Sequence, residues 1–266
     1  MAVVLVISLQ AQSPLVNNMP ASGVLGQSSF TAGSSGLSAS GLNAPSGVAV
    51  DPTTGKLFIA DRYNNRVLRW SSSAKLTNGS PAEAVFGQTD FVTGSSGASA
   101  SRFNDPLRVH VDAVGTLWVS DYLNNRVLRF NNASMKPSGA AADGVLGQPD
   151  FTTTSAATTA SKMRGPVGVF VDAKGTLWVA DRLNHRVLRY NTVNGKANGA
   201  AADGVLGQPD FTTGTSGVSA VKMNRPMGLY ADAEDHLWVT EDDNNRVIRF
   251  DSASARPNGA PANGVL

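Results

Sequence analysis

GPVGVFVDAKGTLWVADRLNHRVLRY, residues 165–190, has an apolar periodicity of two residues. This period predicts β-strands, because successive side chains of a strand point to opposite faces. Three such runs, VGVFVD, TLWVAD and RVLRYN, are separated by the short turns AKG and RLNH. Glycine in the first turn makes a positive φ inexpensive. The stretch therefore predicts three antiparallel strands in succession.

The same pattern recurs at a step of sixty residues. Its third strand appears as DRYNNRVLRW at 61–70, DYLNNRVLRF at 121–130, DRLNHRVLRY at 181–190 and EDDNNRVIRF at 241–250. A second motif, which predicts a fourth strand, appears as VLGQSSF at 24–30, VFGQTDF at 85–91, and VLGQPDF at 145–151 and 205–211. Four short antiparallel strands per repeat are typical of a propeller blade. We therefore predict an all-β propeller of four-stranded antiparallel blades.

Residues 45–70 and 165–190 resemble NHL repeats, whose pattern is Pro-x-Gly-Val-x-Val-Asp, Gly-x-Leu-aromatic-Val-x-Asp and Asn-[His/Asn]-Arg-Val-x-Arg. All four units carry this pattern, at about 45–70, 106–130, 166–190 and 226–250. The resemblance implies a propeller of six, or sometimes five, blades that serves mainly as a binding platform, with enzymes among the relatives of the fold. The repeat unit of sixty residues is long, and this length indicates a bacterial, secreted or cell-surface type of NHL propeller.

Two parts of the chain are expected. Residues 1–22 form an apolar N-terminal segment, which is either a signal-peptide remnant or a strand. Residues 23–266 form the propeller, with repeats at about 23–83, 84–143, 144–203 and 204–263, and with GVL at 264–266 as the start of a fifth. This division predicts a piece of a five- or six-bladed ring. The alternative is a four-bladed ring in which 24–30 pairs with 246–250.

The amino-acid composition and the net charge exclude several classes of function. The chain of 266 residues has no cysteine, which excludes disulfides, thiolate metal sites and a cysteine nucleophile. Its net charge of +2 does not call for a polyanionic partner, so nucleic acid is not expected. The apolar run 2–9 is too short to cross a bilayer, and we predict no membrane span. The expected location is extracellular, at the cell surface or periplasmic, with the cytoplasm left open.

Several polar and aromatic residues recur in every unit. Asp at a strand end and Asn in the following turn are typical of local turn hydrogen bonding, and the next arginine can pair with the carboxylate. A unique active site would not recur, so we interpret these residues as structural. The recurring tryptophans of the second strands are interpreted as packing between blades. The set is Asp61, Asn64, Arg66, Asp121, Asn124, Arg126, Asp181, Asn184, Arg186, Asn244, Arg246, Trp118, Trp178 and Trp238.

Positions where the units disagree are better candidates for a ligand site. Arg108 stands where the other units have glycine, and His110 belongs to a series that continues with Phe170 and Tyr230. Arg108 and His110 share one face of an inner strand, which is expected to line the central channel. We therefore predict that Arg108, His110, Phe170 and Tyr230 bind a ligand.

The predicted function is that of a non-catalytic binding or scaffold propeller. It recognises a protein or carbohydrate ligand through rim loops or the channel face. No catalytic residue, metal ligand or cofactor is predicted, since no motif such as GxSxG or HExxH occurs. A calcium or zinc ion in the channel stays open, because Asp51, Asp112, Asp172 and Asp232 end the four first strands. The alternatives are a lactonase- or lyase-type enzyme with that metal and, third, an RNA-binding platform.

Overall fold

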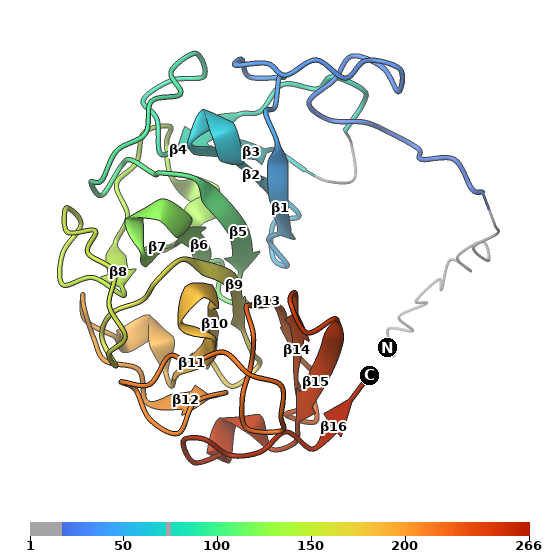
Figure 1. Ribbon diagram of the computed structural model, residues 1–266. Coiled ribbons are helices and arrows are strands. Elements are labelled where there is room, and N and C mark those ends of the chain that lie inside the picture. Colours follow the sequence, from blue (N-terminus) through green and yellow to red (C-terminus); the bar gives the residue numbers. More distant parts are fainter. Residues whose placement is uncertain (1–17, 73–75) are drawn as a thin grey trace, which may run out of the picture.

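The computed structural model describes residues 18–72 and 76–266. In this part of the chain the regular structure consists of sixteen strands in four antiparallel sheets, with short 3₁₀ turns and no α-helix. Figure 1 shows the four sheets following one another around an arc, as the blades of a propeller. The predicted fold class is confirmed. The apolar run 2–9 lies outside the described residues.

Each blade uses four consecutive strands, from the innermost to the outermost. Blade 1 contains β1 (Pro45–Val50), β2 (Leu57–Asp61), β3 (Arg66–Trp70) and β4 (Ala84–Phe86). Blade 2 contains β5 (Pro106–Val111), β6 (Leu117–Asp121), β7 (Arg126–Phe130) and β8 (Gly144–Leu146). Blade 3 contains β9 (Pro166–Val171), β10 (Leu177–Asp181), β11 (Arg186–Tyr190) and β12 (Gly204–Leu206). Blade 4 contains β13 (Pro226–Ala231), β14 (Leu237–Glu241), β15 (Arg246–Phe250) and β16 (Gly264–Val265).

The turn between the second and third strands is a single 3₁₀ turn in three blades. These turns are η1 (Arg62–Asn64), η3 (Tyr122–Asn124) and η5 (Arg182–Asn184). A left-handed residue ends each one, namely Asn65, Asn125 and His185. Asparagine and histidine tolerate this conformation better than most residues do. Three further 3₁₀ turns follow the third strands of blades 2, 3 and 4: η4 (Ala133–Met135), η6 (Val193–Gly195) and η7 (Ala253–Ala255).

The hydrophobic core lies between the blades. Between blades 2 and 3, for example, Trp118 and Val127 of one blade pack with Val169 and Val171 of the next. The tryptophan is 1 % exposed and Val127 is fully buried. Stacked sheets thus bury the two faces that each blade would otherwise expose.

Hydrogen bonds also cross each junction between blades. Arg69 of β3 donates to the carbonyl oxygens of Ala133 and Lys136 in blade 2, 64 and 67 residues further along the chain. The equivalent Arg129 and Arg189 donate to carbonyls of blades 3 and 4. The structure shows that these arginines connect neighbouring blades.

Two expected strand assignments differ from the structure. Residues 264–266 were assigned to a fifth unit, but Gly264 and Val265 form β16, the outer strand of blade 4. Residues 24–30 are not a strand and do not pair with β15. Instead, Val24 exchanges hydrogen bonds with the Asn78–Gly79 segment and Leu25 packs against the core of blade 1. The VLGQ motif thus makes the outer strand only where a third strand of its own blade precedes it.

No helix among the described residues has the length and apolar character that crossing a membrane requires.

Candidate functional site

The recurring Asp, Asn and Arg residues form a buried network in each blade. In blade 2, Asp121 Oδ2 accepts hydrogen bonds from Arg126 Nε at 2.7 Å and from Asn124 Nδ2 at 2.8 Å. Arg126 Nη2 donates to the carbonyl oxygens of Ser99 and Arg102 in the loop before the blade. A single guanidinium nitrogen binds the carboxylate, and the others bind backbone carbonyls. The network fastens the long loop to the blade.

Equivalent networks occupy the other three blades. In blades 1 and 3 they are built from Asp61, Asn64 and Arg66, and from Asp181, Asn184 and Arg186. Glu241 replaces the aspartate in blade 4 and accepts from Asn244 and Arg246. The arginines and carboxylates of blades 1 to 3 are completely buried, so no solute can reach them.

The carboxylates that end the first strands hold the following hairpin. Asp112 Oδ1 accepts from the amides of Val114 and Thr116, and its Oδ2 accepts from the indole of Trp118. Asp172 and Asp232 make the same bonds to Trp178 and Trp238. Asp51 has Phe58 in place of the tryptophan and binds Thr53 and Ser134 instead. These four side chains are committed to local structure.

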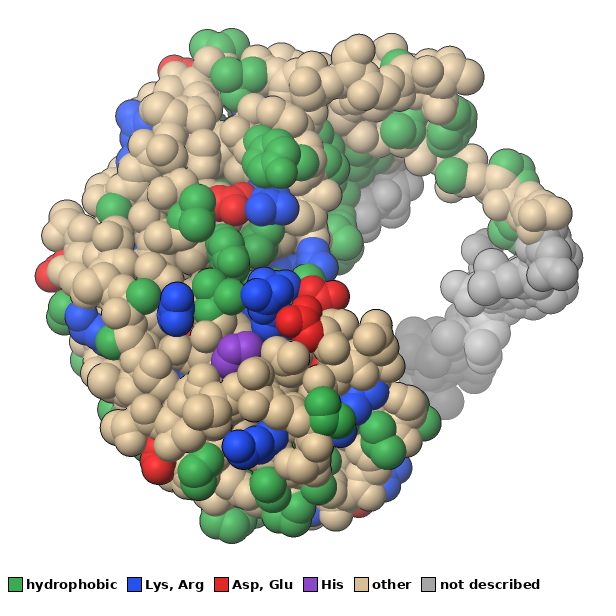
Figure 2. Space-filling view, in the orientation of Figure 1, with side chains coloured by type: hydrophobic (Ala, Val, Ile, Leu, Met, Phe, Trp, Pro, Cys, Tyr) green, Lys and Arg blue, Asp and Glu red, His purple; other side chains and the backbone are tan. Residues whose placement is uncertain are grey.

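A pocket of about 300 Å³ opens at the inner ends of the blades. It is lined by Ser46, Arg62, Leu107, Arg108, Tyr122, Val167, Arg182 and Met227. Five of these residues lie near the start of the inner strands, where each strand has a bulge that re-aims its side chains. Three others are the first residues of η1, η3 and η5. Figure 2 shows basic, acidic and hydrophobic side chains gathered toward this inner edge.

Three arginines line the pocket, and two of them are paired with aspartates. Arg62 makes two bonds to Asp105 of the next blade, at 2.5 and 3.0 Å, and this hydrogen bonding raises the pKa of Arg62. Arg182 Nη2 donates to Asp242 at 2.8 Å, while its Nε is buried without a partner. Within residues 18–72 and 76–266, the guanidinium of Arg108 has no hydrogen-bond or ion-pair partner. Arg108 is therefore the free cation of the pocket.

Packing excludes a side chain at the positions in blades 1 and 3 that are equivalent to Arg108. A Cβ atom on Gly47 would lie 2.9 Å from Leu107 O, and one on Gly168 would lie 2.2 Å from Met227 O. At these two junctions the inner strands approach too closely for any side chain. At the junction between β5 and β9 the equivalent position holds Arg108, whose side chain lines the pocket. The pocket thus coincides with the position where the units differ.

The other predicted ligand residues form a stack of rings. The ring centres of His110 and Phe170 are 4.7 Å apart, and those of Phe170 and Tyr230 are 5.3 Å apart. The rings come from β5, β9 and β13, so the structure brings the three residues together. Burial lowers the pKa of His110, although the charge of Asp112 opposes the shift, and its Nε2 is buried without a partner. None of the three lines the arginine pocket, and their binding role stays a prediction.

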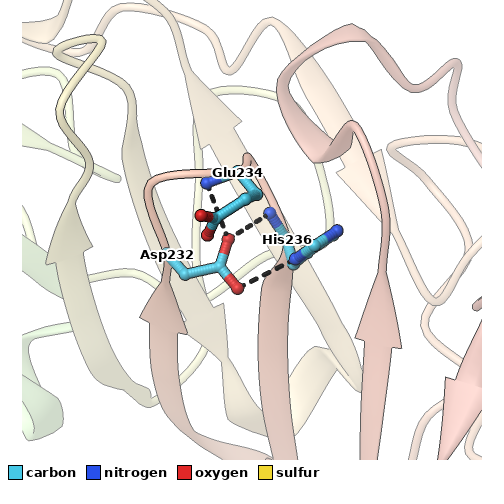
Figure 3. Close-up of side chains that lie close together, drawn as sticks. All are labelled: Asp232, Glu234 and His236. Atoms are coloured by element: carbon cyan, nitrogen blue, oxygen red, sulfur yellow. Dashed lines mark hydrogen bonds and ion pairs between the residues drawn. The ribbon is translucent and has the colours of Figure 1, made fainter.

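One group of side chains has the composition of a metal site. The ligand atoms of Asp232, Glu234 and His236 lie within 4.8 Å of one another in the hairpin between β13 and β14 (Figure 3). His236 Nδ1 is already 2.9 Å from Asp232 Oδ2, which also accepts from Trp238. Burial raises the pKa of Asp232, but the hydrogen bonds from His236 and Trp238 outweigh it and lower the pKa overall. The group lies beyond the end of β13, whereas Met227 of the pocket lies at its beginning.

Sequence reasoning singled out Arg108 but missed Arg62, Tyr122 and Arg182. These three follow the aspartates of the second strands and occupy a variable position of the repeat motif. The available signal was that this position holds a long polar or aromatic side chain in the first three of the four units. Their convergence depends on the radial arrangement of the blades, which a linear motif does not express.

Comparison with known proteins agrees with this architecture. The NHL repeat model matches residues 42–70 and 163–190, so the chain carries NHL repeats. No curated protein matches it. A protein of unknown function from Bacteroides thetaiotaomicron is similar in structure, with a TM-score of 0.53 and 15% identity over 78% of this chain and 46% of that one. This similarity shows a shared fold.

Two lyase structures are also similar. A streptogramin B lyase gives a TM-score of 0.47 and 16% identity over 79% of this chain and 52% of its own. A catalytically inactive virginiamycin B lyase from Staphylococcus aureus, with quinupristin, gives 0.48 and 19% over 80% and 54%. The chain spans about half the length of these structures.

Proposed function

Taking the NHL repeats and the propeller fold as the premise, we propose that this protein binds a ligand that carries a carboxylate. The ligand enters the arginine pocket, and the chain acts as a non-catalytic binding platform. An acidic peptide and an acidic glycan are the two sources of such a group. Both belong to the protein and carbohydrate ligands expected from the sequence.

The observation that carries the proposal is the unpaired guanidinium of Arg108. A half-buried arginine without a partner has lost part of its hydration and has gained no protein acceptor in return. Its planar fork matches the two oxygens of a carboxylate. Arg62 and Arg182 stand beside it and are held in place by Asp105 and Asp242, which compensate their charges. An anion in the pocket would satisfy Arg108.

The other residues that line the pocket indicate the chemical character of the rest of the ligand. Leu107, Val167 and Met227 supply an apolar surface next to the arginines. The volume of about 300 Å³ is at the small end of ligand pockets, which range from about 300 to 1,000 Å³. The pocket thus suits one carboxylate-bearing residue or sugar with an apolar face, at the end of a longer molecule.

Calorimetric titration with a glutamate-rich peptide and with a uronic-acid oligosaccharide tests the proposal and separates the two sources. Arg108→Gly introduces the residue that the other three units carry, so we expect the fold to survive and the affinity to fall. A charge-assisted fork contributes about 1.5–3 kcal/mol to binding, so its loss corresponds to a rise of about 10- to 150-fold in Kd. Arg108→Lys keeps the charge without the fork and should give an intermediate Kd.

Lys222→Ala is the matched control, because it removes one positive charge from an exposed residue that does not line the pocket. It should leave the Kd unchanged. Failure of both anions to bind would overturn the proposal, as would an equal loss in the Arg108 and Lys222 variants. A single-stranded RNA oligonucleotide serves as a third titrant. If it alone binds, the RNA platform replaces the carboxylate ligand.

A further inference from the structure

The hairpin between β13 and β14 differs from the same hairpin in blades 2 and 3 at two positions that can hold a cation. Asp232 begins the hairpin and has an equivalent aspartate in both of those blades. His236 stands where both blades have threonine, and Glu234 stands where they have valine and lysine. Blade 4 thus adds an imidazole and a second carboxylate to the shared aspartate. We call Asp232, Glu234 and His236 the hairpin cluster.

Hydrogen bonds within the turn bring the three side chains together. Asp232 Oδ1 accepts from the amides of Glu234 and His236 at 3.1 and 2.9 Å, and Asp232 Oδ2 lies 2.9 Å from His236 Nδ1. One ligand atom of each residue lies within 4.8 Å of the other two (Figure 3). Ligand atoms around a tetrahedral zinc ion are about 3.4 Å apart, because the bonds are about 2.0–2.2 Å long. The turn therefore holds the three groups near the spacing that coordination requires.

Asp232 can bind a cation and still hold the hairpin. Its Oδ1 keeps both amide bonds, and its Oδ2 keeps the bond from the indole of Trp238. Only the contact between Oδ2 and His236 Nδ1 has to be exchanged for two bonds to the cation. The hairpins of blades 2 and 3 have threonine in place of this histidine and form with the amide and indole bonds. The exchange therefore leaves the fold of the hairpin intact.

The charges of the hairpin cluster favour a cation. Carboxylate oxygens of Asp232 and Glu234 lie within 4.8 Å of each other, and like charges at this distance repel unless a positive charge lies between them. Within the described part of the chain, Glu234 contributes its amide and not its carboxylate to the hydrogen bonds of the hairpin. Asp235 is paired with Lys174 at 2.9 Å, so it is no candidate ligand.

The second ring nitrogen of His236 gives an independent indication. His236 Nε2 lies 3.9 Å from Oδ1 of Asp251, the residue that follows β15. Arg249 holds this carboxylate in place, with its Nε 2.6 Å from the same oxygen. Histidines that bind a metal usually donate their other N–H to a carboxylate, which fixes the tautomer and the orientation of the ring. A cation on Nδ1 would leave the ring proton on Nε2, where it faces Asp251.

We propose that Asp232, Glu234 and His236 bind a zinc ion. Imidazole is a common ligand of zinc, whereas calcium and magnesium prefer oxygen ligands. Three protein ligands leave the fourth tetrahedral position to a water molecule or to an oxygen atom of another ligand. All three residues belong to one hairpin, so the site depends on no other blade. Met227 of the arginine pocket lies near the opposite end of β13, so the zinc site is separate from the pocket.

Calorimetric titration of the full chain with zinc chloride, after treatment with a chelator and dialysis, tests the proposal. We expect saturable binding of one zinc ion per chain. His236→Thr introduces the residue that blades 2 and 3 carry, so the fold should survive. Its Kd should rise by more than about 100-fold, since loss of an outer partner of a metal ligand alone costs about 10- to 100-fold. Glu234→Gln removes a charge at nearly constant size and should also weaken binding.

His185→Asn is the matched control, because it replaces another half-buried histidine with the residue of the equivalent positions. It should bind zinc as the wild type does. Thermal unfolding gives a second readout, since zinc should raise the melting temperature of the wild type but not that of His236→Thr. Absence of saturable zinc binding would overturn the proposal, as would wild-type affinity in His236→Thr or an equal loss in the control. Calcium chloride is the last titrant, and binding of calcium in place of zinc would refute the role of the imidazole.

Discussion

Arg126 Nε lies 2.7 Å from Asp121 Oδ2, and both side chains are completely buried. Removal of the guanidinium would leave a buried carboxylate with fewer donors and would free the carbonyls of Ser99 and Arg102. We expect Arg126→Met to lower the free energy of unfolding by about 3–5 kcal/mol, measured by urea denaturation.

Arg246→Met in blade 4 provides the comparison. Its side chain is 14 % exposed, so water can replace part of what is lost. The loss of stability should be clearly smaller than for Arg126→Met. Equal losses at the two positions would show that burial does not determine the contribution of this network.

His185 gives the junction between blades 3 and 4 a dependence on pH. Its Nδ1 accepts from the amide of Arg225, which requires a neutral ring. Burial and the charge of Arg225 lower the pKa of His185 below its ordinary value of 6.5. The folded state thus prefers the neutral ring, and this stability is present above pH 6.5 and is lost as the pH falls through the lowered pKa.

Thermal unfolding of wild type and His185→Asn between pH 8 and about pH 5 measures this effect. Asparagine occupies the same left-handed position in blades 1 and 2 and keeps an acceptor without titrating. The difference in melting temperature between the two proteins should therefore change toward acid pH, in favour of the variant. A constant difference would contradict the assignment.

Gly168 is required by the close approach of β9 to β13. An added Cβ would lie 2.2 Å from Met227 O, a backbone atom that cannot move alone. Gly168→Ala should therefore destabilise the protein by about 1–3 kcal/mol. At the equivalent Gly228 the nearest atom is the side-chain Oγ1 of Thr240 at 3.0 Å, so Gly228→Ala should cost less. Chemical denaturation of the two variants tests the contrast, and the reverse order would refute it.

Tyr190 carries a hydroxyl group that the packing does not use. The side chain is fully buried, its oxygen has no partner among the described residues, and burial raises the pKa of the phenol. The equivalent residues of blades 2 and 4 are Phe130 and Phe250. Since an unpaired buried polar group costs about 1–3 kcal/mol, Tyr190→Phe should raise the free energy of unfolding by about 1 kcal/mol.

Tyr63→Phe removes the same group from a side chain that is 58 % exposed. Its hydroxyl is hydrated in both the folded and the unfolded state, so the stability should not change. A loss of stability in Tyr190→Phe would mean that the hydroxyl has an acceptor after all.

The propeller fold could be predicted because its strands repeat. Motifs such as RVLRY at 186–190 combine a period of two with fixed turn residues, and both are local properties of the chain. The outer strand was harder to assign. Residues 24–26 and 264–266 share the Val-Leu pair, yet only the second group has a third strand in its own blade to pair with.

The pocket was predictable only in part. Arg108 was visible as a departure from glycine, but the close approach of the inner strands at Gly47 and Gly168, which excludes a side chain there, was not. The approach of Arg62, Tyr122 and Arg182 to Arg108 depends on how successive blades rotate about the centre, and no residue pattern within one unit contains that angle.

The hydrogen bonds of Arg69, Arg129 and Arg189 have a consequence for how such a chain can grow. Each donor reaches acceptors 64 to 67 residues later, always in the following blade. Duplication of one sixty-residue unit in the gene therefore adds two things at once. It adds a new donor arginine, and it adds the carbonyl acceptors for the arginine of the preceding unit. The array can lengthen by whole units while the arginine of each preceding unit keeps its carbonyl acceptors in the following blade. The identical GAAADGVLGQPDFTT at 139–153 and 199–213 is what such an event leaves behind.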